Sequence, residues 1–551
     1  MTAATIDERA PEFDEEPVED ADDEGGQRRR GAGWAGWAIS FCFHTLLIAL
    51  MASIYFLVTV PEVDVPPVRV ATIEPPPKKE EKPKEERTLQ TEIQLEVEAE
   101  SDHPNPISQL DLPVEISERE EESDSPVAKG REEAVADAET GGSGAFMAIG
   151  AGGGSAGMFG ARSGGGKKRA VGRFGGSKGS ESAVDASLRW FKKHQSPNGM
   201  WDFAAYPANC TEDPKCEPGV NSWADRTATV GITGYAVLCF LGAGYDHQTP
   251  NKYKQTVKKG LDYLLSIQKP DGVLGTSNYE NAVATMALAE AYAMTGDPAL
   301  KAPAQHATDS ILARQNRDLA NAGAKDAGYG NGFGWDYFGP TARNDSSVTG
   351  WNVMALKSCL AAQLSIGTGM EGAKVWLEQT WKATNPEWAK LDPYTGQSRF
   401  PYTIDSVTRA IQIAAAPAPG ARALDSWDLT CVGAVCAVFL GHHAGDTMLE
   451  TFANDIMDHE FPKAYPCNTY KLYYNTLSMF QIGGERWKKW NATARDLLVQ
   501  SQRKGNGCFD GSWDFNEKQF PGAIVGRTLS TAYCCLSLEV YYRYAQVAAK
   551  K

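Results

Sequence analysis

The sequence of 551 residues lacks the short motifs that mark several common enzyme classes. No glycine-rich phosphate-binding loop, dinucleotide-binding fingerprint or serine nucleophile elbow stands out. Positive charge is also in short supply, because 54 Lys and Arg stand against 70 Asp and Glu, which gives a formal net charge of −16. Nucleic acids are bound by basic surfaces, so this balance argues against a nucleic-acid partner. We predict no cofactor.

The eleven cysteines include no Cys-x-x-Cys pair of the kind that binds zinc. Most of them stand in apolar stretches and are interpreted as small buried residues. Cys210 and Cys216 differ, since they flank the polar stretch NCTEDPKC. In an oxidising compartment these two can form a disulfide, although the sequence leaves the geometry open. His442 and His443 are adjacent and cannot easily face one ion from a helix, so we predict no metal site.

One long apolar run occupies residues 34–60. At about 1.5 Å per helical residue, the run is long enough to cross a bilayer. Three arginines precede it and acidic residues follow it, which places the N-terminus in the cytoplasm. We therefore expect a single-pass protein of the bacterial inner membrane. Residues 1–33 would be a disordered acidic tail in the cytoplasm, and the C-terminal domain would lie in the periplasm.

Residues 61–180 have the composition of a tether. The first part is rich in Pro, Lys and Glu and should be extended, whereas the last part is rich in Gly and should be flexible. Neither part has enough apolar residues to bury a core. The segment is therefore predicted to be a disordered linker between the span and the C-terminal domain.

The predicted span contains an ionisable residue, His44, with Ser40 four residues earlier on the same helix face. Ionisable residues inside apolar spans are candidates for function. The Ser-x-x-x-His pair and the Pro/Lys/Glu-rich segment after it resemble the anchor of TonB-type energy transducers, over about residues 34–85. The resemblance implies a motor partner of the ExbB/ExbD type. In the alternative interpretation, His44 only hydrogen-bonds Ser40 near the headgroups.

A unit of one helix and one turn recurs in the C-terminal two-thirds of the chain. It is written ASLRWFKKHQSPNGMW, then KGLDYLLSIQKPDGVL, and more loosely ARDLLVQSQRKGNGCFDGSW. The second copy has Leu274 in place of the closing Trp, and the third carries an insertion. Such recurrence predicts a helical repeat fold. The residues that define the copies are Trp190, Gln195, Gly199, Trp201, Gln268, Gly272, Gln502, Gly511 and Trp513.

This unit resembles the QW motif of the squalene-cyclase and prenyltransferase superfamily, over residues 181–547. Helices that are apolar nearly all round, and hence buried, alternate with the copies. The resemblance implies an all-α fold, an (α/α)6 toroid of about six helical hairpins whose inner helices ring a central cavity. The motif's own role is structural: Gln bonds free carbonyls at the helix end, Gly permits a positive φ, and Trp covers the end.

The catalytic motifs of that superfamily are missing from the repeat region, residues 181–547. Its terpene cyclases protonate an alkene with Asp-x-Asp-Asp, and the nearest stretch here is LDSWDLT, with Asp425 and Asp428 before an apolar helix. Asp428 matches the middle acid, but an Asp before a helix also serves as a cap. The zinc-binding Asp-x-Cys of the protein prenyltransferases is absent, as is the Gly-Cys-Gly-Glu-Gln motif of thioester domains.

These absences favour a non-catalytic module rather than an enzyme. The toroid would bind or scaffold a hydrophobic, glycan or protein ligand. Two alternatives stay open. The first is an enzyme, either a divergent terpene-cyclase-like enzyme with Asp428 as its acid or a lyase- or hydrolase-like toroid with unassigned acids. The second is a force-transducing partner of an ExbB/ExbD-type motor.

Overall fold

The chain divides into two compact units, residues 1–111 and 112–551. In the first unit, Phe41 and residues 44–46 are helical and exposed, whereas Ser40 and most of the predicted span lie outside the described residues. The predicted tail, 1–33, also lies outside them. The computed structural model describes residues 41, 44–46, 160–162, 164–219, 228–317, 333–388, 400–412, 429–517, 519–520, 525–546 and 548.

The predicted membrane location is contradicted. Among the described residues, we find no helix that combines the length and the apolar character needed to cross a membrane. The single-pass inner-membrane placement, with its periplasmic C-terminal domain, is therefore not carried further.

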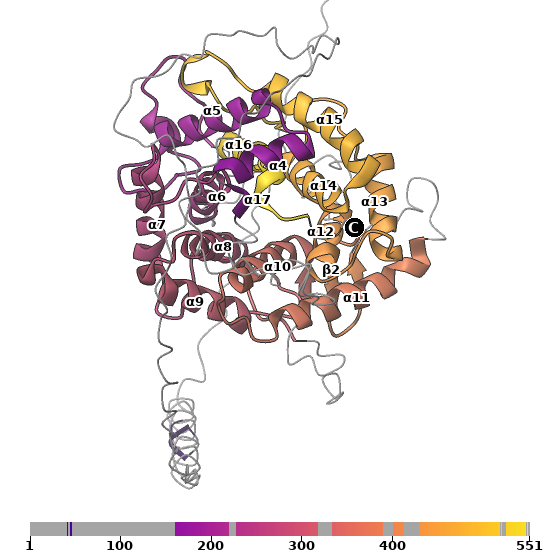
Figure 1. Ribbon diagram of the computed structural model, residues 1–551. Coiled ribbons are helices and arrows are strands. Elements are labelled where there is room, and N and C mark those ends of the chain that lie inside the picture. The colour runs from indigo at the N-terminus through magenta and orange to yellow at the C-terminus, as the bar shows by residue number, and fades with distance from the viewer. Residues whose placement is uncertain are drawn as a thin grey trace, which may run out of the picture. The chain divides into compact units, whose positions relative to one another are not determined.

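In the described part of the second unit, six inner helices are surrounded by six outer helices (Figure 1). Neighbouring inner helices pack against each other, and the last packs against the first, which closes the ring. The predicted all-α toroid of helical hairpins is confirmed. The outer helices are α5 (Lys178–His194), α7 (Lys254–Ile267), α9 (Pro298–Ala313), α11 (Gly369–Trp388), α13 (Thr447–His459) and α15 (Gly484–Ser501). The inner helices are α6 (Thr229–Gly242), α8 (Asn278–Thr295), α10 (Ser346–Ala361), α12 (Thr430–Phe439), α14 (Thr469–Ile482) and α16 (Arg527–Leu538).

The two rings follow from two kinds of helix. Every residue of α6 is buried, as its uniformly apolar sequence requires. Helix α5 instead buries one stripe, which includes Val184, Leu188 and Phe191, and exposes charged residues on its other face. Small residues let the inner helices approach closely, since a Cβ at Gly234 would lie 3.0 Å from the Val283 side chain. The core therefore lies between the rings and within the inner ring.

The recurring glutamines join one outer helix to the next. Each side-chain amide donates one hydrogen bond to a carbonyl in its own turn and another to a carbonyl of the following outer helix. The last copy reaches back to α5, so it joins the end of the domain to its start. The bonds are Gln195 to Gly199 (2.9 Å) and Thr256 (3.0 Å), Gln268 to Gly272 (3.1 Å) and Pro303 (2.9 Å), and Gln502 to Gly511 (2.9 Å) and Ala183 (2.7 Å).

The tryptophans of the motif cover the outer-helix ends. The indole of Trp201 donates to the Phe191 carbonyl at 2.7 Å, and that of Trp513 donates to the Leu498 carbonyl at 2.9 Å. Trp190 lies elsewhere and donates to the Cys508 carbonyl at 2.9 Å.

A further copy of the unit was missed in the sequence. Gln315 donates to the carbonyls of Phe333 (2.8 Å) and Gly369 (2.9 Å), and the indole of Trp335 donates to Ile311 (2.9 Å). The residues between Gln315 and Phe333 separate the two halves of the motif, which hides it from a search at fixed spacing.

Residues 160–162 and 164–174 of the predicted linker are helical, contrary to the expectation of a disordered segment. Residues 160–162 form the short helix η2 (Gly160–Arg162), and α4 spans Gly164–Phe174. Packing overrides the low helix propensity of glycine here. The Phe174 carbonyl accepts a hydrogen bond from the Trp487 indole at 2.9 Å, and the Lys167 ammonium lies 4.3 Å from the centre of the Tyr542 ring.

A buried ion cluster lies at the C-terminal ends of the inner helices. Glu290 of α8 pairs with Arg162 at 2.8 Å and with Arg543 at 3.2 Å, and all three side chains are fully buried. Arg543 ends α17 (Val540–Arg543), which, like α4, lies towards the middle of the ring (Figure 1). Arg162 also donates to the Leu241 carbonyl of α6. Segments from both ends of the domain therefore meet inside the ring.

A small antiparallel sheet departs from the all-helical expectation. It consists of β1 (Arg343–Asp345), β2 (Thr403–Asp405) and β3 (Ile411–Gln412), and Arg343 is opposite Asp405. Strand β1 leads directly into α10, so the sheet lies at the N-terminal ends of the inner helices, opposite the ion cluster.

Candidate active site at the sheet end of the ring

Asp345 connects the sheet to helix α10. As the N-cap of α10, its Oδ1 accepts hydrogen bonds from the backbone amides of Ser347 (2.9 Å) and Val348 (3.2 Å). Its Oδ2 pairs with Arg343 at 2.9 Å. The carboxyl is fully buried, and burial raises its pKa above the ordinary 3.8, although hydrogen bonds from Ser347 and the charge of Arg343 act in the opposite direction.

Arg343 holds a second carboxylate, Asp336. Its other terminal nitrogen pairs with Asp336 Oδ1, so that one guanidinium bridges two acids. The side chain of Arg343 is 37% exposed and that of Asp336 is 13% exposed, whereas Asp345 is not exposed. Burial lowers the pKa of Arg343, but the charges of Asp345 and Asp336 outweigh burial and leave the pKa raised. The three groups carry a formal charge of one negative unit when ionised.

Two tyrosines complete this cluster, which we name the rim cluster: Asp336, Tyr337, Arg343, Asp345 and Tyr402. The two hydroxyl oxygens lie 3.4 Å apart, and the guanidinium of Arg343 lies 5.5 Å from the centre of the Tyr402 ring. Burial and the nearby Asp345 charge raise the pKa of Tyr402 to about 12, so its hydroxyl stays protonated at neutral pH. The cluster thus offers both acceptors and donors to a polar ligand.

The start of α8 anchors the turn that carries Asp336. The backbone amide and the side-chain amide of Asn278 donate to the carbonyls of Tyr337 and Asp336, each at 2.8 Å. Arg314 in turn donates to the Asn278 side chain at 3.1 Å. These bonds position Asp336 against Arg343 without using its carboxylate.

An aromatic layer fills the inner ring. The Trp351 ring stacks on Tyr473, with centroids 6.0 Å apart, and its indole donates to the Tyr279 hydroxyl at 2.8 Å. The hydroxyls of Tyr235 and Tyr533 lie 3.0 Å apart. Four of these side chains are buried in the described core, and the fifth, Tyr279, is partly buried and packs against it.

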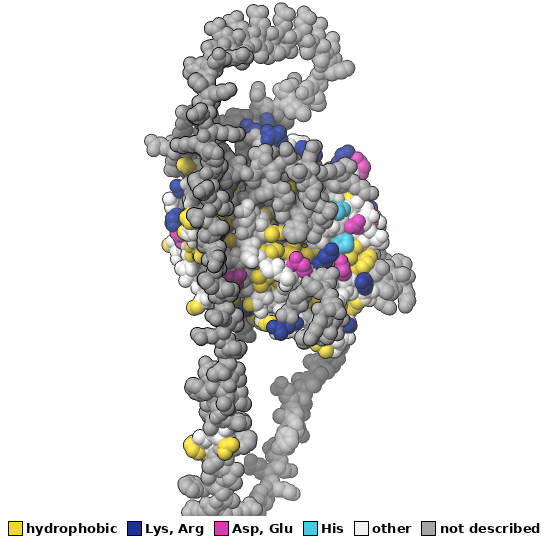
Figure 2. All heavy atoms as spheres, turned by 60° about the horizontal axis from the view of Figure 1, so that its bottom comes forward, with side chains coloured by type: hydrophobic (Ala, Val, Ile, Leu, Met, Phe, Trp, Pro, Cys, Tyr) yellow, Lys and Arg dark blue, Asp and Glu magenta, His cyan; other side chains and the backbone are white. Residues whose placement is uncertain are grey.

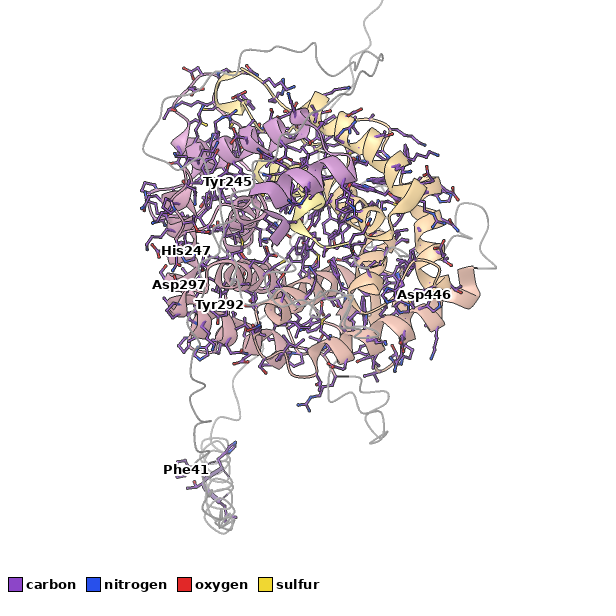
Figure 3. All side chains as sticks on the ribbon, viewed as in Figure 1. Phe41, Tyr245, His247, Tyr292, Asp297 and Asp446 are labelled. Carbon is purple, nitrogen blue, oxygen red and sulfur yellow. The ribbon has the colours of Figure 1, made fainter. Side chains whose placement is uncertain are left out.

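One charged pair of the described residues lies away from the rim cluster. His247 pairs with Asp297 at 2.8 Å near the outer edge of the ring, where Asp297 also caps α9 (Figure 3). On the face shown in Figure 2, acidic and basic side chains of the described residues are interspersed, and neither sign forms a patch there.

The predicted acids cannot be placed, because Asp425 and Asp428 lie outside the described residues. The N-cap position of α12 is Leu429, which has no side-chain capping bond. Cys210 and Cys216 are buried free thiols, and both lie beside His194. The rim cluster was missed because Asp336 meets Arg343 only through a turn of residues 333–340, which has no repeating pattern.

No family model matches the sequence, and no curated protein matches it either. Solved structures match it at low similarity. An inactive variant of the α-1,6-mannanase GH76A of Salegentibacter sp. HEL1_6 with α-1,6-mannotriose has a TM-score of 0.42 and 11% identity, over 66% of this chain and 99% of that chain. A type II terpene cyclase from Scytonema with geranylgeranyl dihydroxybenzoate has a TM-score of 0.40 and 12% identity, over 66% and 97%. An unsaturated glucuronyl hydrolase specific for heparin has a TM-score of 0.39 and 13% identity, over 66% and 96%.

These matches contradict the prediction of a non-catalytic module. Most of them are sugar-processing enzymes, including mannanases, an amylase and a glucuronyl hydrolase. The binding or scaffolding role is withdrawn, as are the terpene-cyclase and motor alternatives. At these scores the likeness assigns no chemistry to this chain, which has to be argued from its own residues.

Proposed function

We propose that this protein is an enzyme that acts on a neutral carbohydrate at the rim cluster. The observation that supports the proposal is the bridging of two carboxylates by Arg343, at a position that is partly open to solvent. A cluster with one guanidinium and two carboxylates repels an anionic substrate but accepts hydrogen bonds from sugar hydroxyls. Tyr337 and Tyr402 add aromatic faces beside these groups.

The roles follow from exposure. Asp336 and Arg343 are partly exposed, so they contact the substrate, with Asp336 as the catalytic carboxylate. Asp345 is fully buried and acts through Arg343, so it is a positioning residue. Carboxylates in different environments are the usual source of acid and base catalysis in sugar cleavage.

The test is a turnover assay with the full-length chain and a panel of neutral oligosaccharides, with products measured by chromatography and mass spectrometry. We expect cleavage of at least one panel member and a loss of kcat of about a hundredfold or more in Asp336→Asn. Asp262→Asn is the matched control, since Asp262 is an exposed acid paired with Lys258 on α7, and its activity should not change. No turnover of any sugar, or full activity in Asp336→Asn, contradicts the proposal.

The same assay examines the acids that the sequence singled out. Asp425 and Asp428 precede α12, and sugar cleavage needs a second carboxyl group. A loss of turnover in Asp425→Asn or Asp428→Asn would place that group in the segment before α12, and unchanged turnover in both would exclude it from there.

A further inference from the structure

Three potential metal ligands meet at the C-terminal end of α5. His194 is the last residue of that helix, and Cys210 and Cys216 follow the short helix η3 (Tyr206–Asn209). His194 Nε2 lies 3.3 Å from Cys210 Sγ and 3.7 Å from Cys216 Sγ. The three ligand atoms lie within 4.8 Å of one another, and all three residues are buried.

These spacings suit a tetrahedral zinc ion. Zinc binds sulfur at about 2.3 Å and nitrogen at about 2.0–2.1 Å, so neighbouring sulfur and nitrogen ligands lie about 3.5 Å apart. The observed distances of 3.3 Å and 3.7 Å fall on either side of that value. A disulfide would need a sulfur–sulfur distance of about 2.05 Å, but both thiols are free.

The other imidazole nitrogen orients His194 as a metal ligand. His194 Nδ1 lies 2.8 Å from the Trp190 carbonyl oxygen. A carbonyl only accepts hydrogen bonds, so Nδ1 carries the proton and, in the neutral ring, the lone pair of Nε2 faces the two sulfurs. A histidine that ligates a metal usually donates its second N–H to a carbonyl or a carboxylate in this way.

A candidate fourth ligand comes from the opposite end of the domain. Cys508 of η5 (Gly507–Phe509) is buried and its thiol interacts with that of Cys210, but it is not among the three residues whose ligand atoms lie within 4.8 Å of one another, so its side chain has to turn towards the site when the metal binds. Backbone amides already donate to two of the sulfurs, from Glu212 to Cys508 at 3.2 Å and from Cys216 to Cys210 at 3.4 Å. Such bonds stabilise the negative charge of metal-bound thiolates.

We propose that His194, Cys210, Cys216 and Cys508 bind one zinc ion in a structural Cys3His site. Thiolate ligands select zinc over magnesium or calcium, and a buried set of four ligands leaves no position for substrate. Each of the three cysteines loses its thiol proton when the metal binds. The Cys-x-x-Cys spacing of common zinc sites is absent, because the ligands come from three separate segments.

The zinc ion would link the first and the last outer helix at the position where the ring closes. His194 ends α5, the first outer helix, and Cys508 follows α15, the last one, and these two helices pack against each other. The site would therefore reinforce the contact that Gln502 makes with α5. Its role is stability of the closed ring, independent of catalysis at the rim cluster.

Elemental analysis of the full-length chain, purified under reducing conditions without chelator, tests the proposal. We expect about one zinc per chain, and loss of the zinc in Cys216→Ser and in His194→Gln. Cys436→Ser is the matched control, because Cys436 is a fully buried cysteine on α12, and it should keep the zinc. All eleven thiols should react once the protein is denatured. A chain without zinc overturns the proposal. In that case, eleven reactive thiols indicate that all cysteines are free, and nine indicate a disulfide.

A second measurement needs no variant. The wild-type protein is stripped with a chelator and titrated with cobalt(II). The proposal predicts a thiolate-to-cobalt charge-transfer band and the intense visible bands of a tetrahedral ion, and zinc should abolish both. It also predicts that the chelator lowers the Tm of the wild-type protein. A spectrum without charge transfer, or a Tm that the chelator leaves unchanged, overturns the proposal.

Discussion

Replacing Glu290 with glutamine is expected to lower the free energy of unfolding by about 3–5 kcal/mol, because two buried arginines would lose the carboxylate that pairs with both, which leaves Arg543 with the more distant Glu539 at 3.7 Å. Glu290 accepts from Arg162 at 2.8 Å and from Arg543 at 3.2 Å, and Ser358 donates to it at 3.1 Å. Lys357 is also buried nearby, with its ammonium 4.1 Å from the centre of the Tyr544 ring. Denaturant unfolding of the full-length chain, followed by circular dichroism, measures the loss.

The control is Glu485→Gln. Glu485 pairs with Lys488, but its side chain is 86% exposed, so its removal should change stability by less than about 1 kcal/mol. Equal losses in the two variants would contradict a structural role for the ion cluster.

The Glu290 effect should depend on pH. Burial alone raises the pKa of Glu290, but the charges of Arg162 and Arg543 outweigh burial and leave the pKa below the ordinary 4.5. A carboxyl with a lowered folded-state pKa adds stability above its unfolded pKa and loses it as the pH falls through the folded value. The stability difference between wild type and Glu290→Gln should therefore be complete near neutral pH and shrink below about pH 4.5. A difference that grows in acid would contradict this assignment.

Replacing Gly511 with alanine is expected to lower the free energy of unfolding by about 2–5 kcal/mol. Gly511 has a φ of +89°, which a residue with a Cβ adopts only at a cost. A Cβ there would also lie 2.2 Å from the Ala186 carbonyl oxygen of α5. The obstacle is helix backbone, which cannot rotate away, so α5 and the last repeat would have to separate. The loss is measured by the shift in the denaturant midpoint.

Gly505→Ala separates the two causes. Gly505 has a φ of +62° in the same turn region, but no atom lies within 4 Å of its added Cβ. Its replacement should cost only about 1 kcal/mol, from the backbone conformation alone. If the two variants lose the same stability, the close approach of Gly511 to α5 contributes nothing.

The sequence predicted less of the sites than of the fold. It singled out Cys210 and Cys216, but not His194, although His194 directly precedes the motif glutamine. The distance between His194 and Cys216 depends on the loop after η3, and Cys508 joins from the far end of the domain. Asp336 and Asp345 belong to one cluster only because Arg343 forms an ion pair with each of them. Contacts of this kind have no sequence period, so no local pattern predicts them.

The sequence by itself predicted the repeated pairs of helices, and its resemblance to the squalene-cyclase and prenyltransferase superfamily implied the ring. Gln195, Gly199 and Trp201 act within one helix end and one turn, and uniformly apolar segments can be buried only as inner helices. Only the tertiary structure decided what the ring's two ends contain. Arg162 contacts Glu290 and Arg543, which lie 128 and 381 residues away in the sequence, and residues 160–162 and 164–174 around it are helical although the sequence predicted a flexible stretch there. The physical reason is that short-range hydrogen bonding and apolar periodicity depend on residues that are close together in the sequence. The pairing of buried charges instead depends on which segments the closed ring brings together.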